Sequence, residues 1–412
     1  MHHKFEYMCI HCQKTYQGKQ EVHYLCQDCS KTNTDKLPPA GALKVLYAYE
    51  EARAFSPNFY TLKMRNFIDI LPVSSTKSLP PLRIGQTPLY KYVQSSDSKW
   101  PFHVFLKDDS QNPTFSFKDR ASALVSAFAK ENNLETIVAA STGNAGSSMA
   151  GICAAQQQKA IIMTPASAPP AKLSQVLMYG ARLVPVNGTY DDAFELSLAA
   201  TKAFGWYNRN TGYNPLTVEG KKTASLELFD QMEGRIPDRI FVSVGDGVII
   251  SGLYKGYEDL LKLGLTDQMP VIVAVQSEKS DNLVRNIKNE HFRAVPASTL
   301  ADSISVDVPR NFFMARQYIN KYDGEGLTVS DAEILKASSA LARSSGIFAE
   351  PAAAAAFAGL LKYHRMEMLK PGSSNVVMLT GSGLKDLKGI KTVLKMPGPV
   401  DCNLDALRRF LN

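Results

Sequence analysis

The sequence has little cysteine, no long hydrophobic run and no block of basic residues. Six cysteines in 412 residues are too few for a disulfide scaffold. No apolar run reaches the roughly 18 residues that a membrane helix needs, so we expect no membrane span. The net charge is +7, but the Lys and Arg residues are dispersed, which argues against nucleic-acid binding. No apolar signal-peptide core follows the first residues, and we expect a cytoplasmic protein.

Four of the six cysteines lie near the N-terminus in a regular pattern. Two C-x2-C pairs are separated by thirteen residues, which is typical of tetrahedral zinc sites. We expect a structural zinc ion bound by Cys9, Cys12, Cys26 and Cys29. Four thiolates leave no open position on the metal, which argues against a catalytic zinc. Free thiols and two adjacent disulfides are the alternatives, and we expect His11 and His23 to be bystanders.

From residue 102 onward, short apolar stretches alternate with stretches of helical pattern. Nearly continuous apolar strands separated by helices are typical of parallel sheets that are covered by helices. We expect strands at residues 102–107, 136–140, 160–164, 182–186, 239–244, 271–276 and 375–380. We expect helices at residues 145–158, 171–179, 193–204, 221–232, 250–262 and 331–344. The sequence therefore predicts an α/β body.

Three of the expected strand-to-helix junctions are rich in glycine and hydroxyl groups. They are residues 141–147, 244–251 and 379–386. Ligands of parallel α/β folds bind at the carboxyl ends of strands, where backbone N–H groups at helix N-termini can hold a phosphate or a carboxylate. None of the three fits the dinucleotide-binding or P-loop pattern, so nicotinamide and P-loop nucleotide binding are disfavoured.

A single lysine, Lys118, lies at a fourth junction, between the expected strand at 102–107 and a helical run at 121–130. The positive end of the helix dipole, together with burial, would lower the pKa of this lysine. A lysine with a lowered pKa is suited to Schiff-base chemistry, whereas a surface lysine on a first helical turn is the alternative for this stretch alone. The four junctions together are consistent with one phosphorylated ligand that carries a carbonyl group.

Four segments occur in the order and spacing of a known family. They are residues 116–120 (S-F-K-D-R), 141–146 (S-T-G-N-A-G), 346–352 (G-I-F-A-E-P-A) and 379–386 (L-T-G-S-G-L-K-D). Together they resemble the threonine synthases, within the tryptophan-synthase-β-like class of pyridoxal-phosphate enzymes. The resemblance covers about residues 82–390. It implies fold type II, with two doubly wound parallel-sheet domains.

The resemblance implies a role for each matching residue. Lys118 would form a Schiff base with pyridoxal 5′-phosphate, Asn144 would bind the 3′-oxygen of the cofactor, and Thr380 would meet its pyridine nitrogen. The cofactor phosphate would be held by Gly245, Asp246, Gly247, Val248 and Ile249. The substrate carboxylate would be held by Ser141, Thr142 and Gly143.

The implied reaction converts O-phospho-L-homoserine and water into L-threonine and phosphate by γ-elimination and β-hydration. Lys118 would move the protons, and a small domain would close over the site. The family also implies a homodimer. Two alternatives stay open: a cysteate synthase-like enzyme that carries out β-replacement on O-phosphoserine, and a regulatory protein that retains an enzyme fold. The presence of Lys118, Asn144 and Thr380 argues against the regulatory protein.

The sequence also departs from the family pattern in places. Phe115 stands where many relatives have glycine, and Asp246 where asparagine is commoner. Thr217 occupies the position of an arginine that often binds the substrate phosphate. Three lysines are the candidates for that contact, and the sequence does not choose among Lys172, Lys221 and Lys222. A site role for Glu350 is likewise open.

We expect four parts along the chain. Residues 1–35 would form a zinc-ribbon-like unit, and residues 36–101 an N-terminal region and linker, within which 45–54 is either a strand or a short helix. Residues 102–390 would form the cofactor-binding body, with a smaller mobile domain around 118–215. Residues 391–412 would be a C-terminal tail.

Overall fold

The computed structural model describes residues 4–18, 22–34, 36–93, 100–168, 170–391, 394 and 396–411, without the side chains of residues 170–172. Its larger sheet has six strands in the order β12 (Glu325–Val329), β11 (Val271–Ser277), β10 (Arg239–Ser243), β13 (Ser374–Leu379), β5 (His103–Asp108) and β4 (Leu89–Lys91). All neighbouring strands are parallel except β4 and β5. This confirms the predicted α/β class with parallel sheets.

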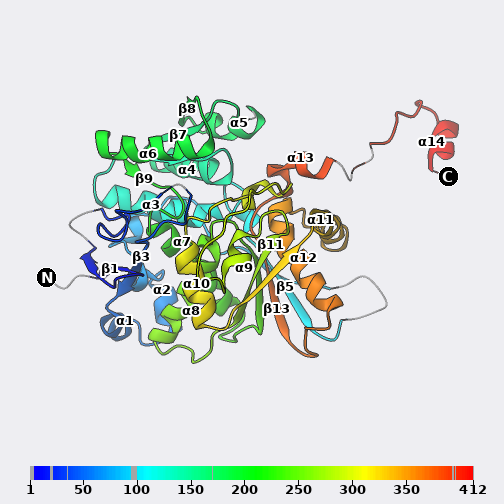
Figure 1. Ribbon diagram of the computed structural model, residues 1–412. Coiled ribbons are helices and arrows are strands. Elements are labelled where there is room, and N and C mark those ends of the chain that lie inside the picture. Colours follow the sequence, from blue (N-terminus) through cyan, green and yellow to red (C-terminus); the bar gives the residue numbers. More distant parts are fainter. Residues whose placement is uncertain are drawn as a thin grey trace.

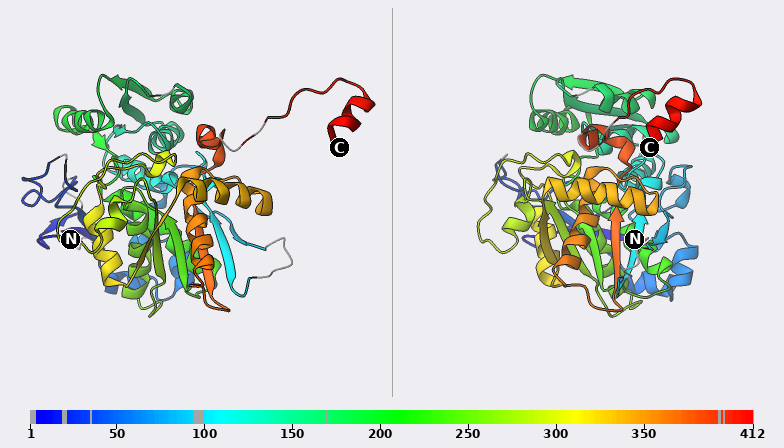
Figure 2. Two further views of the ribbon diagram at one scale, coloured as in Figure 1. Left: turned by 45° about the vertical axis from the view of Figure 1, so that its right-hand side comes forward. Right: turned by 90° about the vertical axis from the view of Figure 1, so that its right-hand side faces the viewer.

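A second, four-stranded sheet lies beside the first (Figures 1 and 2). It is parallel throughout, in the order β8 (Arg182–Val186), β7 (Lys159–Pro165), β6 (Thr136–Ala140) and β9 (Tyr207–Asn208). The sequence pattern did not predict β9 and β12, because β9 has only two residues and β12 is partly exposed and contains a glycine.

Helices connect and cover the two sheets. They are α3 (Lys118–Glu131), α4 (Asn144–Gln156), α5 (Pro170–Met178), α6 (Tyr190–Phe204), α7 (Leu216–Gln231), α8 (Val248–Lys262), α9 (Asn282–Asn286), α10 (Phe312–Lys321), α11 (Asp331–Ser345), α12 (Pro351–Arg365) and α13 (Leu387–Ile390). Single 3-10 turns are η1 (Ile68–Ile70), η2 (Thr76–Ser78), η3 (Asp109–Gln111), η4 (Asp302–Ile304) and η5 (Gly383–Lys385). No helix of the described residues has the length and apolar character needed to cross a membrane.

Helix α7 begins earlier than the expected residue 221. Pro215 precedes its first residue, and the Asn214 side chain accepts a hydrogen bond from the Leu216 N–H at 2.9 Å. Proline at the start of a helix lacks only a donor that would have no helical partner, and a side-chain acceptor satisfies another. Thr217 and Lys221 therefore lie one turn apart on the same helix, a relation that is central to the site.

The alanine-rich helix α12 packs closely on the larger sheet. Residues 352–356 are all buried, and a Cβ atom added to Gly359 would lie 2.6 Å from a Val275 methyl group. Small side chains allow this short distance between helix and strands, and interiors are packed too densely to leave the intervening space empty. The helix thereby holds its first residues, next to Glu350, against the end of β13.

The N-terminal residues form a third, antiparallel sheet in the order β2 (Thr15–Gln17), β1 (Phe5–Cys9) and β3 (Leu43–Tyr47). β3 lies beyond residue 35, and α1 (Tyr49–Phe55) follows it, so the stretch 45–54 contains both a strand and a helix. α2 (Phe59–Met64) comes next. The Tyr47 and Tyr49 hydroxyls donate to Glu219 on α7 and Asp259 on α8, which attaches this sheet to the body.

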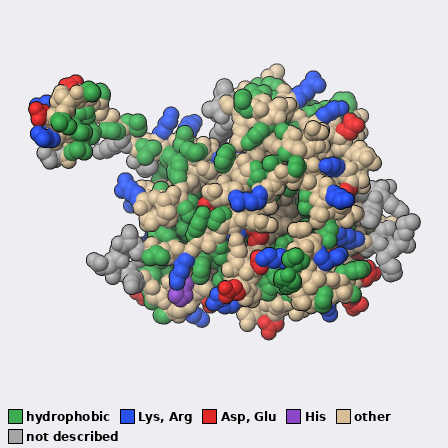
Figure 3. All heavy atoms as spheres, turned by 180° about the vertical axis from the view of Figure 1, so that it is seen from behind, with side chains coloured by type: hydrophobic (Ala, Val, Ile, Leu, Met, Phe, Trp, Pro, Cys, Tyr) green, Lys and Arg blue, Asp and Glu red, His purple; other side chains and the backbone are tan. Residues whose placement is uncertain are grey.

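The C-terminal residues leave the body as an arm. Residues 396–403 have no regular structure, and α14 (Leu404–Leu411) follows them at a distance from both sheets (Figures 1 and 2). Seen from behind, the arm carries several hydrophobic side chains on its surface (Figure 3). Leu404, Phe410 and Leu411 are among the exposed ones.

Candidate active site

A cavity lies at the carboxyl ends of β10 and β13. Side chains and backbone from all four predicted junctions line it. The lining residues are Phe117, Lys118, Asn144, Thr211, Ser243, Val244, Gly245, Asp246, Gly247, Val248, Ile249, Ser303, Ile304, Glu350, Ala352 and Thr380. The structure therefore brings together the residues that the resemblance assigned to the cofactor, namely Lys118, Asn144, Thr380 and residues 245–249.

Backbone hydrogen bonds hold the lysine at the cavity. Lys118 is the first residue of α3. The N–H group of Phe117 donates to the Thr380 carbonyl at 2.9 Å, and the N–H group of Ser382 donates to the Phe115 carbonyl at 3.1 Å. Ser116 pairs with Gly381 between these two bonds. The loop before Lys118 is thus joined to the loop after β13 through main-chain groups.

Phe115 adopts a backbone conformation that glycine would adopt without strain. Its φ angle is +68°, in the left-handed region where a Cβ atom crowds the following carbonyl. Its N–H group donates to the Asn112 carbonyl at 2.8 Å, so the turn is hydrogen-bonded in spite of the unfavourable dihedral. The departure from the family's glycine therefore occurs at a position where the backbone itself requires positive φ.

The environment of Lys118 lowers its pKa. Burial is the largest cause, and the nearby Arg209 guanidinium lowers the pKa further, whereas Asp246 and Glu350 raise it. Burial disfavours an ammonium ion because it removes the ion from water, and a like charge adds to this effect. The direction agrees with the prediction from the sequence. A larger share of Lys118 is consequently a neutral amine, the form that can react with a carbonyl group.

The loop between β10 and α8 exposes backbone donors to the cavity. Gly247 has a φ angle of +86°, and a Cβ atom at Gly245 would lie 3.2 Å from the Ile304 Cα atom. The Asp246 side chain accepts the N–H group of Arg310 at 3.2 Å, so one of its carboxylate oxygens is engaged by the protein. The N–H groups at the N-terminus of the 15-residue helix α8 are suited to an anion.

Asn144 and Glu350 meet at the same cavity. The Asn144 amide donates to both carboxylate oxygens of Glu350, at 2.9 and 3.1 Å. Burial raises the pKa of Glu350 to about 7, although the hydrogen bond from Asn144 acts in the opposite direction. The sequence left the role of Glu350 open, and the structure places it in the site.

A second cavity opens next to the first. It shares Asn144, Ser303 and Glu350 with the first cavity and also contains Gly143 and Lys385. Ser141 and Thr142 lie on the same loop but are not among the residues that line these two cavities. The Lys385 ammonium donates to the Ser147 hydroxyl at 2.9 Å. The loop expected to hold a substrate carboxylate therefore borders an extension of the lysine cavity.

The family model for pyridoxal-phosphate dependent enzymes matches residues 81–381. The chain belongs to this family. It is 31% identical over 412 residues to a threonine synthase of Methanocaldococcus jannaschii and 32% identical over 409 residues to one of Methanosarcina acetivorans, with 98% of each chain covered in both cases. Its fold matches that of O-ureido-L-serine synthase with a TM-score of 0.66 at 21% identity, over 79% of this chain and 97% of that one.

The cavity of this pyridoxal-phosphate dependent enzyme fits the chemistry of the family cofactor. The half-buried Lys118, with its lowered pKa, suits the aldehyde, and the N–H groups of residues 245–249 suit the phosphate. Asn144 and Thr380 supply an amide and a hydroxyl at the same cavity.

Two buried cations, Arg209 and Lys221, lie near Lys118, and the sequence had not placed the first of them in the site. The Nη2 atom of Arg209 and the Nζ atom of Lys221 are buried without a hydrogen-bond partner among the described residues. No sequence pattern pointed to Arg209, because this residue follows the two-residue strand β9, which was not predicted. Lys221 was one of three candidates for a phosphate contact.

The other candidates differ from Lys221. Lys222 contacts Glu219 and Asp259, both at 2.6 Å, in a buried ion network. The Thr217 hydroxyl donates to the Asn214 carbonyl at 2.7 Å, so its own backbone already engages it. The side chain of Lys172 lies outside the described part of the structure. Among the described candidates, Lys221 alone lacks a partner for its ammonium group.

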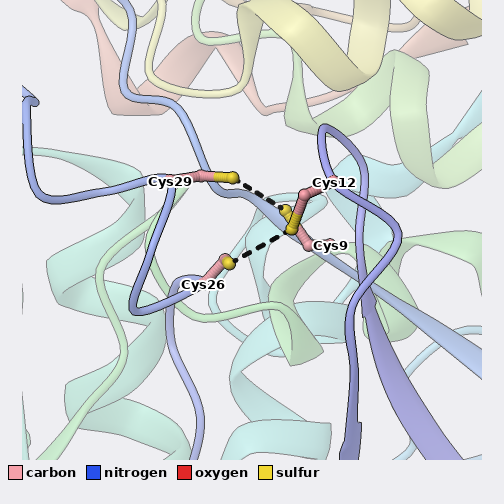
Figure 4. Close-up of side chains that lie close together, drawn as sticks. All are labelled: Cys9, Cys12, Cys26 and Cys29. Carbon is pink, nitrogen blue, oxygen red and sulfur yellow. Dashed lines mark hydrogen bonds between the residues drawn. The ribbon is translucent and has the colours of Figure 1, made fainter.

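The four N-terminal cysteines converge on one point (Figure 4). Their sulfur atoms all lie within 4.8 Å of one another, with Cys9–Cys29 at 3.8 Å and Cys12–Cys26 at 3.6 Å. A tetrahedron with Zn–S bonds of about 2.3 Å has sulfur–sulfur edges of about 3.8 Å. These separations exceed the roughly 2.05 Å of a disulfide bond. The geometry is compatible with zinc, and the imidazole of His11 instead accepts the Gly41 N–H group.

Proposed function

We propose that this enzyme is a threonine synthase, which converts O-phospho-L-homoserine and water into L-threonine and phosphate. One observation carries the proposal: a single cavity collects Lys118, Asn144, Thr380 and the loop 245–249. Relatives named threonine synthase support it, because they match the chain over 98% of its length. The reaction class is that of a pyridoxal-phosphate dependent carbon–oxygen lyase acting on a phosphate ester.

Each cavity residue receives a binding role in this proposal. Lys118 would hold the cofactor covalently, and the N–H groups of Gly245, Asp246, Gly247, Val248 and Ile249 would bind its phosphate. Asn144 would bind the ring oxygen, and Thr380 would meet the pyridine nitrogen. When bound, pyridoxal phosphate withdraws electrons from the α-carbon of the amino acid and makes its proton labile.

Lys118 also serves as the base. Burial and Arg209 lower its pKa, so a larger share of its amine is neutral and can accept the α-proton and return it to a neighbouring carbon. Backbone bonds to the loop after β13 hold the amine in place during these transfers. A base whose pKa is shifted toward the working pH is more efficient than an ordinary lysine, which stays charged.

The substrate carboxylate is assigned to Ser141, Thr142 and Gly143. This loop precedes the 13-residue helix α4, whose N-terminal N–H groups and dipole favour an anion. Asn144 lies on the smaller sheet's side of the cavity and Thr380 on the larger sheet's side. We therefore propose that the smaller domain, around residues 118–215, closes on the larger one and excludes water before phosphate leaves.

The test is an assay with two substrates. Purified holoenzyme should release phosphate and form threonine from O-phospho-L-homoserine, and it should not form cysteate from O-phosphoserine and sulfite. The reverse result would replace the proposal with a β-replacement enzyme. Absence of turnover with both pairs would favour a regulatory protein that retains the fold.

Three further properties belong to this proposal. The cysteine geometry supports a structural zinc ion, which metal analysis of the purified protein would detect. The family resemblance supports a homodimer, which sedimentation would check. The expected cytoplasmic location rests on the sequence alone, and fractionation of cells would check it.

A further inference from the structure

Two buried cations, one on helix α7 and one directly after strand β9, lie near each other. Arg209 directly follows β9, and Lys221 lies in the second turn of α7. Both side chains have no measurable exposure. The Nη2 atom of Arg209 and the Nζ atom of Lys221 have no hydrogen-bond partner among the described residues. A buried polar group without a partner costs free energy, and a buried charge costs more.

Each cation is held near its base, while one nitrogen at its tip has no partner among the described residues. Arg209 donates from Nη1 to the Thr211 hydroxyl at 2.6 Å and from Nε to the Ser122 hydroxyl at 3.3 Å, which leaves Nη2 unused. Thr211 itself lines the Lys118 cavity. The first carbon of the Lys221 side chain is packed against α8, because a Cβ atom on Gly252 would lie 2.6 Å from it.

The two cations and Lys118 share one electrostatic environment. Lys118 and Arg209 both lower the pKa of Lys221, after burial, and Asp246 raises it. The three cations therefore lie close enough to repel one another, with Asp246 as the nearby carboxylate. An entering dianion would relieve this repulsion, because opposite charges favour the charged form of each lysine and arginine.

We propose that Arg209 and Lys221 form a second phosphate subsite, which binds the phosphoryl group of the substrate. This inference rests on the proposed function, since it assigns the leaving group of that reaction. The cofactor phosphate already has the N–H groups of residues 245–249. A guanidinium and an ammonium ion suit a phosphate dianion, the first by directed N–H groups and the second as a compact charge.

The first test uses inorganic phosphate and the purified holoenzyme, in which the cofactor phosphate occupies its own site. Phosphate should raise the thermal midpoint of the wild type, since a ligand that binds only the folded state stabilises it. This effect should be lost in Lys221→Gln and reduced in Arg209→Lys. Lys202→Gln, a change of an exposed lysine on α6, should respond as the wild type does.

The second test separates the two phosphates. In Lys221→Gln, the KM for O-phospho-L-homoserine should rise roughly ten- to a hundredfold, the scale of one hydrogen bond to a charged group. The kcat should change much less. The affinity for the cofactor, followed by its absorbance during titration of the apoenzyme, should stay at the wild-type value. Arg209→Lys, which keeps the charge, provides a folded variant if Arg209→Gln does not fold.

Three outcomes would overturn the inference. A loss of cofactor affinity in Lys221→Gln with an unchanged response to phosphate would assign the lysine to the cofactor phosphate. If phosphate does not change the thermal midpoint of the wild type, there is no second phosphate subsite. An unchanged KM in both variants would make the cations structural. By contrast, stabilisation by phosphate that depends on Lys221, in an enzyme without turnover, would support the subsite and refute the proposed function.

Discussion

Two consecutive residues of α7 enter two very different buried regions. Lys222 belongs to a network in which both lysines contact both carboxylates: Lys222 and Lys255 with Glu219 and Asp259. Lys221 belongs to the cluster with Lys118 and Arg209, where Nζ has no partner among the described residues. All these side chains except Lys118 are fully buried or nearly so.

The two regions show how buried charges that stabilise the fold differ from buried charges that bind a ligand. The network contains two cations and two anions and is further hydrogen-bonded by Tyr47 and Tyr49, so its charges are compensated within the protein. The cluster beside Lys118 has more cations than carboxylates and is compensated only when an anion enters. Buried charges need partners, and a set that lacks them indicates where a ligand of opposite charge binds.

The largest effect is expected from Lys118→Ala, which removes the central member of the uncompensated cluster. Formation of threonine from O-phospho-L-homoserine should fall by about a thousandfold or more, because both the covalent attachment and the proton transfer are lost. The cofactor absorbance band of the attached form should disappear as well. Lys202→Ala is the control, and a Lys118 variant that retains both signals would remove this residue from the mechanism.

The sharpest contrast is expected between Lys222→Met and Lys221→Met. The first change leaves buried carboxylates without a cation and should lower the free energy of unfolding by about 3–5 kcal/mol. The second removes a cation without partners and should change it by less than about 1 kcal/mol, or stabilise the protein. Urea denaturation measures both. Equal losses in the two variants would abolish the distinction between the two regions.

The carboxyl of Glu350 provides a pH-dependent test of the site region. Burial raises its pKa from 4.5 to about 7. The folded protein keeps this proton after the unfolded chain has lost it, so the free energy of unfolding should fall as pH rises from 4.5 to 7. The fall should reach at most about 3 kcal/mol. Glu350→Gln cannot ionise and should lack it. Urea denaturation at a series of pH values would show the difference, and parallel profiles would contradict it.

A smaller effect is expected from a change in the N-terminal sheet that packs against the Lys222 network. Cys9→Ser removes one thiolate of the proposed zinc site, next to the sheet whose Tyr47 reaches Glu219. The metal content should fall, and the thermal midpoint should drop by roughly 2 °C. Cys402→Ser, far along the chain and exposed, is the control. Wild-type protein purified without chelator and free of zinc would refute the metal site.

The smallest effect concerns the turn that leads to Lys118. Phe115→Gly should stabilise the protein by about 0.5–1 kcal/mol, because glycine adopts the +68° φ angle without strain. Phe115→Ala keeps the dihedral strain and serves as the comparison, since the phenylalanine side chain is already 51% exposed. Chemical denaturation of the three proteins would decide. A Gly variant no more stable than the Ala variant would show that the turn stores no strain.

Local sequence patterns predicted the strands that consist mainly of consecutive apolar residues. The expected strands at 136–140 and 182–186 coincide with β6 and β8, because continuous apolar residues bounded by polar ones suffice to mark them. The two-residue β9 has no such pattern. Since β9 was missed, the position of Arg209 beside Lys118 could not be predicted.

The choice among the candidate lysines required the tertiary structure. Neighbouring residues on a helix point about 100° apart, so Lys221 and Lys222 must face different surroundings. Helix periodicity does not say which of them faces the cavity, because that depends on how α7 docks against α8. By contrast, Lys118, Asn144 and Thr380 each follow a strand, and the parallel fold brings such positions to one edge. The cofactor and substrate roles given to these residues stay predictions.

The main-chain bonds between the Lys118 loop and the loop after β13 have an evolutionary consequence. Carbonyl and N–H groups are present whatever side chain a residue carries, so mutation can replace the surrounding side chains while the lysine keeps its place. Substrate specificity could therefore change during evolution while the position of the reactive lysine stays the same. O-ureido-L-serine synthase, with the same fold at 21% identity, illustrates how far the sequence around such a scaffold can diverge.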